Sequence, residues 1–238
     1  MFRQSVAKKI QSSNKEFRLR GHEVKRIEAF SDAVFAFAVT LLIVSLEVPR
    51  SFEELIINMR GFFAFSICFL FLMLIWYEQN VFFRRYGLHD VVTITLNAIL
   101  IFLVLFYVYP LKFLFTLMFS DQIYGAGNSP FRITSNDVPE LMVVYGMGFI
   151  LIYLVFFLMY NHALRKKEEL ELTPAEQFDT RTKMFAHIIL IAVGILSVVM
   201  SQLLPSQMAG SSGFTYFLIG PAFYFFYSIR EQRKKKAL

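Results

Sequence analysis

The most informative pattern of hydrophobic and polar positions lies in residues 26–48. Its first seven positions carry four charged or hydroxyl side chains, those of Arg26, Glu28, Ser31 and Asp32. The run that follows, residues 33–46, is apolar except for Thr40 and Ser45. At the helical rise of about 1.5 Å per residue, this segment reaches roughly 33 Å and crosses a bilayer core. Because charges near hydrocarbon are costly, we expect the three charged side chains to be paired inside a helical bundle.

Five further apolar runs predict helices that cross the membrane. They cover about residues 52–77, 90–110, 140–162, 184–204 and 214–229. Pro110 is expected to kink or end its helix, and the apolar residues beyond it leave open a continuation of the helix to Phe119 despite Lys112. Ahead of the fifth helix, Thr173 is a predicted N-cap, with Pro174 at the first helical position and Glu176 at the third. With the first run, the pattern predicts an all-α integral membrane protein with six transmembrane helices per subunit.

Composition supports a membrane protein and argues against several other classes. Hydrophobic residues make up 56% of the chain, its mean hydropathy is +0.53, and 29 of its 238 residues are Phe, more than a soluble core needs. The single cysteine, Cys68, lies in an apolar run, so one chain has neither a disulfide framework nor a cysteine metal site. The net charge of +6 does not indicate nucleic acid, because the basic residues cluster beside the apolar runs.

Lysine and arginine predict the orientation of the helices. Only four of them fall in segments that alternation places outside: Arg50, Arg60, Lys112 and Arg132. By the positive-inside rule, we expect a multi-pass protein of the cell (inner or plasma) membrane with both termini in the cytoplasm. Residues 1–25 then form a cytoplasmic basic segment, residues 26–230 the six-helix transmembrane domain, and residues 231–238 a basic cytoplasmic tail.

Motifs of catalysis and metal binding are absent from the sequence. It contains no HExxH helix, CxxC pair, Walker loop or GxSxG elbow. The four histidines lie near predicted helix ends or loops, at His22, His89, His162 and His187. Histidines at such positions are more often structural than catalytic, so we expect neither an enzyme nor a bound metal or cofactor.

A selectivity filter of backbone carbonyls, of the Thr-Val-Gly-Tyr-Gly type, is also missing. The nearest echo, residues 144–148, lies inside an apolar helix, where its two glycines favour close helix packing. An ion path in this protein would therefore have to be lined by side chains.

The first helix can supply such a lining, because one of its stripes is apolar. The stripe consists of Phe30, Phe37, Leu41, Val44 and Val48, with Ala33 and Thr40 at its flank. Around an axis it would form stacked apolar rings with one hydroxyl ring, a constriction that can gate by dewetting. Ordinary helix packing explains the same periodicity, so the pattern alone leaves both interpretations open.

The start of the first helix also carries a signature. Arg26-x-x-x-Phe30-Ser31-Asp32 continues directly into the apolar run from Ala33 to Leu42. Further residues follow in a matching order and spacing, at Trp76, Asp90, Asn97 and Pro110. Together they resemble the lysosomal and prokaryotic potassium-channel family called transmembrane protein 175, over most of the chain. Six spans correspond to one repeat of that family, which implies a homotetramer like those of its prokaryotic members.

The resemblance implies a potassium-selective, leak-type cation channel whose first helices line a central fourfold pore. Phe37 would then occupy the narrow hydrophobic ring, with Leu41 and Val44 in the rings beyond it. Thr40 would form a hydroxyl layer linked to selectivity. A structural network would hold the pore helix against helices two and three: Arg26, Phe30, Ser31, Asp32, Trp76 and Asn97. The implied partners are copies of the chain, membrane lipid and permeant potassium ions, without cofactor or nucleic acid.

Two features depart from the family pattern. Phe37 stands where the family usually has Ile or Leu, and an aromatic ring is larger and attracts cations. The histidine common about three residues after Trp76 is replaced by Glu78, Gln79 and Asn80, which puts any pH sensitivity tied to it in question. A second Phe-Ser-Asp, at residues 119–121, is a coincidence, because it has neither the arginine nor the helix that should follow.

Two other classes compete with a channel. A secondary transporter would show paired broken helices around a midplane substrate site, and Pro110 marks the only clear break. A non-conducting assembly or lipid-binding protein would have no pore. Subunit number discriminates between them, because a tetramer with its first helices at the axis favours the channel.

Overall fold

A computed structural model describes residues 17–44, 49–125, 127, 130, 131 and 133–237. Every regular element in this part of the chain is a helix, which confirms the all-α prediction. The elements are α2 (Arg26–Val44), α3 (Phe52–Tyr86), α4 (Val91–Met118), α5 (Ser120–Tyr124), α6 (Val138–Arg165), α7 (Pro174–Leu203), the 3-10 helix η1 (Ala209–Leu218) and α8 (Ile219–Ala237). Predictions for residues 1–16 and 45–48 lie outside the described residues.

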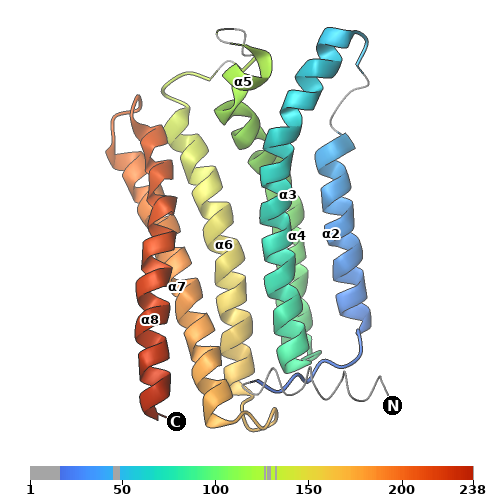
Figure 1. Ribbon diagram of the computed structural model, residues 1–238, viewed down its shortest axis with the longest axis vertical. Coiled ribbons are helices and arrows are strands. Elements are labelled where there is room, and N and C mark those ends of the chain that lie inside the picture. The colour runs from blue at the N-terminus through green and yellow to red at the C-terminus, as the bar shows by residue number, and fades with distance from the viewer. Residues whose placement is uncertain (1–16, 45–48, 126, 128–129, 132, 238) are drawn as a thin grey trace.

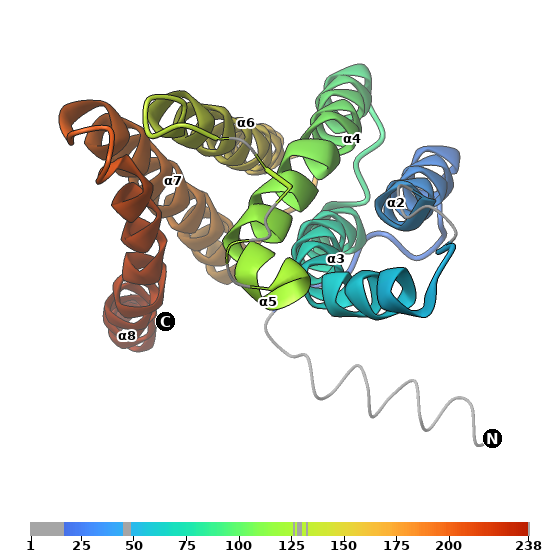
Figure 2. The same cartoon turned by 90° about the horizontal axis from the view of Figure 1, so that it is seen from above.

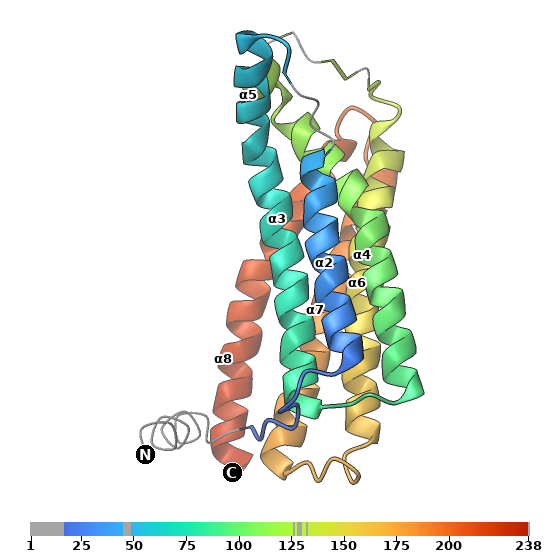
Figure 3. The ribbon, with the colours of Figure 1, turned by 90° about the vertical axis from the view of Figure 1, so that its right-hand side faces the viewer.

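The long helices stand side by side in one elongated bundle (Figure 1). Among the described elements, α2 packs against α3 and α4 alone, and α8 lies at the opposite side of the subunit (Figure 2). The first turns of α3 extend beyond the end of α2 (Figure 3), because its 35 residues span about 52 Å. One end of the bundle carries Arg84, Arg85, Arg165 and Lys166 and is called the basic end. It contains the starts of α2, α4 and α7 and the ends of α3 and α6 (Figure 1). α2 is thus an edge helix, covered on one side.

Helix ends follow their capping residues. Ser51 adopts an extended backbone, and its side chain accepts a hydrogen bond from the Glu54 N–H at the start of α3. Gly87 ends that helix in the left-handed conformation, with φ of 60°. Thr173 and Glu176 form the predicted capping box of α7, since each side chain accepts from the other residue's backbone N–H, at 3.3 and 3.0 Å.

Four helices, α3, α4, α6 and α7, are long and apolar enough to cross a membrane, so the chain is a multi-pass membrane protein. α2 and α8 have 19 residues each and are not among these four. α4 does not end at Pro110 but continues through it to Met118. A proline inside a helix costs about 3 kcal/mol. Packing offsets this cost, because Val108 and Leu111 on either side of the proline are buried. The last predicted run is not one α-helix, because it begins as η1.

Two glycines bring α6 close to its neighbours. A Cβ atom on Gly146 would clash with Val198 of α7, and one on Gly148 would clash with the ring of Tyr107 of α4. Tyr107 also donates its hydroxyl to the Tyr145 carbonyl at 2.9 Å. The packing interpretation of residues 144–148 is therefore confirmed, and α6 joins the α2–α4 part of the bundle to α7.

Candidate pore-lining site

α2 is divided into a buried stripe and an exposed face. The buried stripe faces α3 and α4 and consists of Ser31, Phe35, Ala38 and Leu42. On the exposed face, the side chains of Phe30, Phe37 and Leu41 are 57%, 56% and 41% exposed. Ala33 and Thr40 are exposed too and lie opposite the buried stripe, at about 100° per residue. A single subunit therefore leaves this largely apolar face uncovered. The side chains of Val44 and Val48 lie outside the described residues.

Thr40 presents a hydroxyl oxygen on the exposed face of α2. Its Oγ1 donates a hydrogen bond to the Phe37 carbonyl at 2.7 Å. A hydroxyl has one proton to donate and two lone pairs that accept. Because the backbone takes the proton, the oxygen is left as an acceptor, and acceptor oxygens can replace part of the hydration shell of a cation.

A buried polar triad joins α2, α3 and α4. Asn97 donates from Nδ2 to Ser31 Oγ at 2.7 Å and accepts at Oδ1 from Gln79 Nε2 at 2.5 Å. Ser31 Oγ in turn donates to the Ile27 carbonyl at 2.8 Å. All three side chains are buried. An unpaired buried polar group costs about 1–3 kcal/mol, so the triad fixes the rotation and depth of α2 against its two neighbours.

The charged residues at the start of α2 are less enclosed than the sequence predicts. Asp32 accepts a hydrogen bond from the Trp76 indole N–H at 2.7 Å, so the structure brings these two signature residues together. Arg26 is exposed and lies near Phe30 and His89 in an open hollow at the basic end. Pairing of Arg26 inside the bundle is therefore wrong for one subunit, because none of the described helices covers that face of α2.

Lys112 of α4 holds the opposite end of α2. Its Nζ donates to the Leu42 carbonyl at 2.6 Å. The last carbonyls of a helix carry a partial negative charge, so an ammonium group there stabilises the helix end. In the sequence Lys112 was only one of four outer basic residues; its contact depends on α4 continuing past Pro110.

A second polar cluster lies between α3, α6 and α7. The Glu78 carboxylate accepts hydrogen bonds from Lys183 Nζ and from the Tyr160 hydroxyl, each at 2.8 Å. His187 Nε2 lies 3.6 Å from the same carboxylate. The cluster ties α3 to the other half of the bundle, and leaving such a partly buried carboxylate without its partner is strongly destabilising.

Asp90 precedes α4 at the basic end and is well paired. Its Oδ1 accepts from the Thr93 hydroxyl at 2.6 Å, and its Oδ2 lies 2.8 Å from His162 Nε2 and 3.7 Å from Lys166 Nζ. Partial burial raises the pKa of Asp90, but the hydrogen bonds with Thr93 and His162 and the nearby cationic groups outweigh this effect. The pKa of Asp90 therefore lies below its usual value.

Asp90→Asn is expected to make protein stability depend less on pH under acid conditions. The lowered pKa makes the carboxylate stabilising above the unfolded pKa of about 3.9, and this contribution is lost as the pH falls through the folded pKa. Thermal unfolding of the purified protein from about pH 7 to about pH 3 measures the difference. Asp121→Asn on α5 is the control. Parallel profiles for the Asp90 variant and the wild type would contradict the expectation.

The bundle defines the class of the protein as a multi-pass helical membrane protein with an uncovered edge helix. The family model for the endosomal/lysosomal potassium channel TMEM175 matches residues 26–108, that is α2, α3 and most of α4. A potassium channel from Marivirga tractuosa is 41% identical over 239 residues, which cover 94% of this chain and 95% of the relative. A potassium channel from Chamaesiphon minutus is 28% identical over 149 residues, 59% of this chain and 66% of the relative.

Solved structures agree with these relatives. The crystal structure of a variant of the potassium channel MtTMEM175 has a TM-score of 0.81 and 39% identity, covering 92% of this chain and 98% of that chain. That of a lysosomal potassium-selective channel TMEM175 homolog from Chamaesiphon minutus has a TM-score of 0.50 at 23% identity, over 86% and 96%, and shares the fold. The chain therefore belongs to the TMEM175 family of potassium channels, which are ion channels and not enzymes.

Proposed function

We propose that four copies of this chain form a potassium-selective, leak-type cation channel in which the four α2 helices line a central pore. The observation that carries the proposal is the uncovered face of α2, where Phe37 is 56% exposed and Leu41 is 41% exposed. Lipid covers exposed apolar side chains equally well, so what favours a pore axis beside this face is the exposed acceptor oxygen of Thr40 on it. Membership of a potassium-channel family supports this assembly, and the lack of a carbonyl filter in the sequence requires side chains as lining.

In this pore the four Phe37 side chains form the narrowest, hydrophobic ring. Leu41 and Val44 form the rings beyond it, and such apolar constrictions gate by dewetting. Thr40 supplies one layer of acceptor oxygens next to the narrow ring, because its proton is bound to the Phe37 carbonyl. Potassium ions are the permeant partner, and no cofactor takes part in conduction.

The signature residues position the pore helix without touching the ion. The contacts Asn97–Ser31 and Trp76–Asp32 support this role, since both join α2 to a neighbouring helix. Arg26 and Phe30 complete the set at the uncovered face, where the neighbouring subunit would meet them.

The basic end faces the cytoplasm of a cell whose inner or plasma membrane holds the channel. The clustering of Lys and Arg at this end supports the orientation. α2, and η1 with α8, add two crossings to the four long apolar helices, so that both termini lie in the cytoplasm.

A matched pair of alanines on α2 tests the pore assignment. Ala33 lies on the exposed face, whereas Ala38 is completely buried against α3 and α4. In liposomes, a charged methanethiosulfonate reagent should block potassium flux through Ala33→Cys and leave Ala38→Cys unaffected. The native thiol of Cys68 is buried and gives no background. An equal response of the two variants would contradict an α2-lined pore.

A further inference from the structure

Residues 17–25, the N-terminal strap, run across the basic end and lead directly into α2 (Figure 1). The backbone N–H groups of Arg20 and Gly21 both donate to the Arg84 carbonyl at 3.1 Å. Gly21 packs so closely on α3 that a Cβ atom would clash with the Phe83 carbonyl. The ring of Phe17 meets that of Tyr86 edge to face at 5.6 Å. The strap is therefore fixed on the end of α3.

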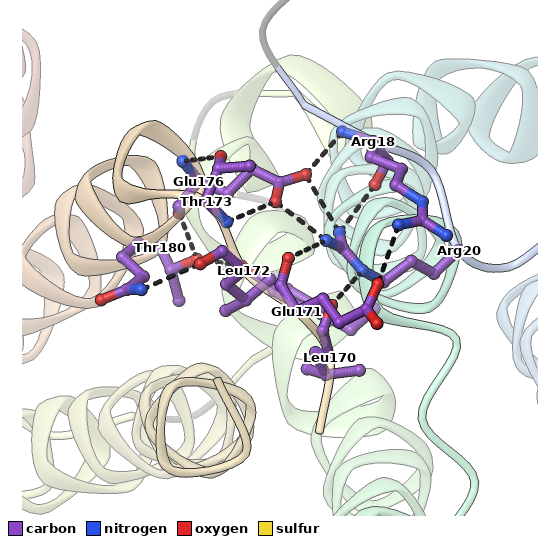
Figure 4. Close-up of polar contacts among 10 residues, drawn as sticks. Arg18, Arg20, Leu170, Glu171, Leu172, Thr173, Glu176 and Thr180 are labelled. Atoms are coloured by element: carbon purple, nitrogen blue, oxygen red, sulfur yellow. Dashed lines mark hydrogen bonds and ion pairs between the residues drawn. The ribbon is translucent and has the colours of Figure 1, made fainter. Parts of the chain in front are cut away.

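Arg20 also fixes the strap to α7. Its guanidinium donates two parallel hydrogen bonds to the Glu176 carboxylate, from one terminal nitrogen to Oε1 at 3.0 Å and from the other to Oε2 at 2.8 Å (Figure 4). Its Nε donates to the Leu170 carbonyl at 2.8 Å. The side chains of Arg20 and Glu176 are only 10% and 2% exposed. A bidentate arginine–carboxylate pair of this kind is strong and geometrically specific.

The carboxylate of Glu176 is held in position for its contact with Arg20 by further hydrogen bonds. It accepts from the backbone N–H of Thr173 at 3.0 Å and of Arg18 at 2.7 Å. The first of these bonds belongs to the capping box, so the rotamer of Glu176 is set by the start of α7 itself. The strap therefore docks on a preorganised acceptor, and not on a mobile surface side chain.

The strap links α7 to a helix that α7 does not touch. α2 packs on α3 and α4 among the described elements. Four residues lie between Gly21 and Arg26, and the five steps from one Cα atom to the next reach at most about 18 Å in an extended chain. The basic end of α2 is thus connected by a short segment to the part of the strap that α3 and α7 hold in place. A shift of α7 against α3 would therefore move the point to which this short link attaches α2.

We propose that Arg20 and Glu176 form a latch that positions the basic end of α2 and thereby keeps the pore narrow. The proposal rests on α2 lining the pore, as proposed above. Arg20 is a positioning residue, since it contacts Glu176 and backbone carbonyls and acts on conduction through the strap. Without the latch the basic ends of the four α2 helices can separate, so potassium leak rises.

Liposome flux of the full-length protein tests the latch. Arg20→Gln and Glu176→Gln should each raise potassium flux about 2- to 30-fold, the range that residues coupling distant sites produce. The double variant should exceed neither single variant, because both remove the same contact. Arg20→Lys keeps the charge but cannot form the two parallel hydrogen bonds, so its flux should lie between that of the wild type and that of Arg20→Gln. If Arg20→Gln does not assemble, the flux of Arg20→Lys decides the outcome. Wild-type or lower flux in Arg20→Lys and both glutamine variants would overturn the proposal.

Arg18→Gln is the matched control in the same strap. Within the described part of the chain, the Arg18 side chain makes one exposed ion pair, with Glu171 at 3.3 Å, and the two side chains are 67% and 77% exposed. Loss of this exposed ion pair in Arg18→Gln should leave potassium flux unchanged. Spin labels on Val24→Cys, which is 72% exposed, report distances between subunits without any conduction. Arg20→Gln should broaden these distances, and an unchanged distribution would overturn the latch. A wild type that conducts no potassium would instead contradict the proposed function.

Discussion

Phe37→Ala is expected to raise potassium flux about 5- to 30-fold, which corresponds to a barrier lower by about 1–2 kcal/mol. Phe37 is 56% exposed on the uncovered face of α2, so in the proposed tetramer the variant removes four aromatic rings from one layer of the proposed pore. A narrow apolar ring excludes water, whereas a wider one keeps a continuous water column. Bilayer recordings or liposome flux of the purified variant measure the change.

Two companion variants make this result specific. Phe37→Leu installs a smaller, non-aromatic side chain and should give an intermediate flux. Phe225→Ala removes a 64% exposed ring from α8, far from α2, and should leave flux unchanged (Figure 2). Wild-type flux in Phe37→Ala, with normal expression and assembly, would remove Phe37 from the constriction.

Thr40→Val is expected to lower the potassium-to-sodium permeability ratio about two- to tenfold, since the lost oxygen contact is worth about 0.5–1.5 kcal/mol. Valine has almost the same shape as threonine, so pore width changes little. Thr40 Oγ1 gives its proton to the Phe37 carbonyl at 2.7 Å, and only the acceptor oxygen is left for an ion. The reversal potential with potassium on one side and sodium on the other measures the ratio.

Thr40→Ser separates the hydroxyl from the side-chain shape. It keeps the oxygen and the hydrogen bond to Phe37 while losing a methyl group. A reversal potential close to that of the wild type is therefore expected for Thr40→Ser. If Thr40→Val also keeps the wild-type reversal potential, selectivity does not depend on this hydroxyl.

Short-range chemistry explains which parts of the fold could be predicted from the sequence. The capping box of Thr173 and Glu176 depends on two residues three positions apart, and it forms as predicted. The same holds for the glycines of residues 144–148, whose small size permits close packing whatever the neighbour is. The sequence left open whether the third helix ends at Pro110 or continues to Phe119, because burial of the residues around the proline decides the outcome.

The candidate site could be predicted only in part. Ser31 and Asn97 were named from the signature, and their side chains meet at 2.7 Å. The signature does not include Gln79, which completes the triad. A usable signal existed, because Gln79 is polar, lies three residues after Trp76 and so shares its helix face.

Contacts between distant residues account for what the sequence missed. Arg20 and Glu176 are 156 residues apart, and Lys112 reaches a carbonyl 70 residues before it. No periodicity or spacing pattern relates such positions. In the sequence Arg20 and Lys112 look like ordinary interfacial charges, and Glu176 looks like a capping residue alone.

Ion flux into liposomes reconstituted with the purified protein tests the central claim most directly. Uptake is driven first by a potassium gradient and then by an equal sodium gradient. We expect potassium flux well above sodium flux. No flux of either ion, or equal flux of both, would contradict a potassium-selective pore lined by α2.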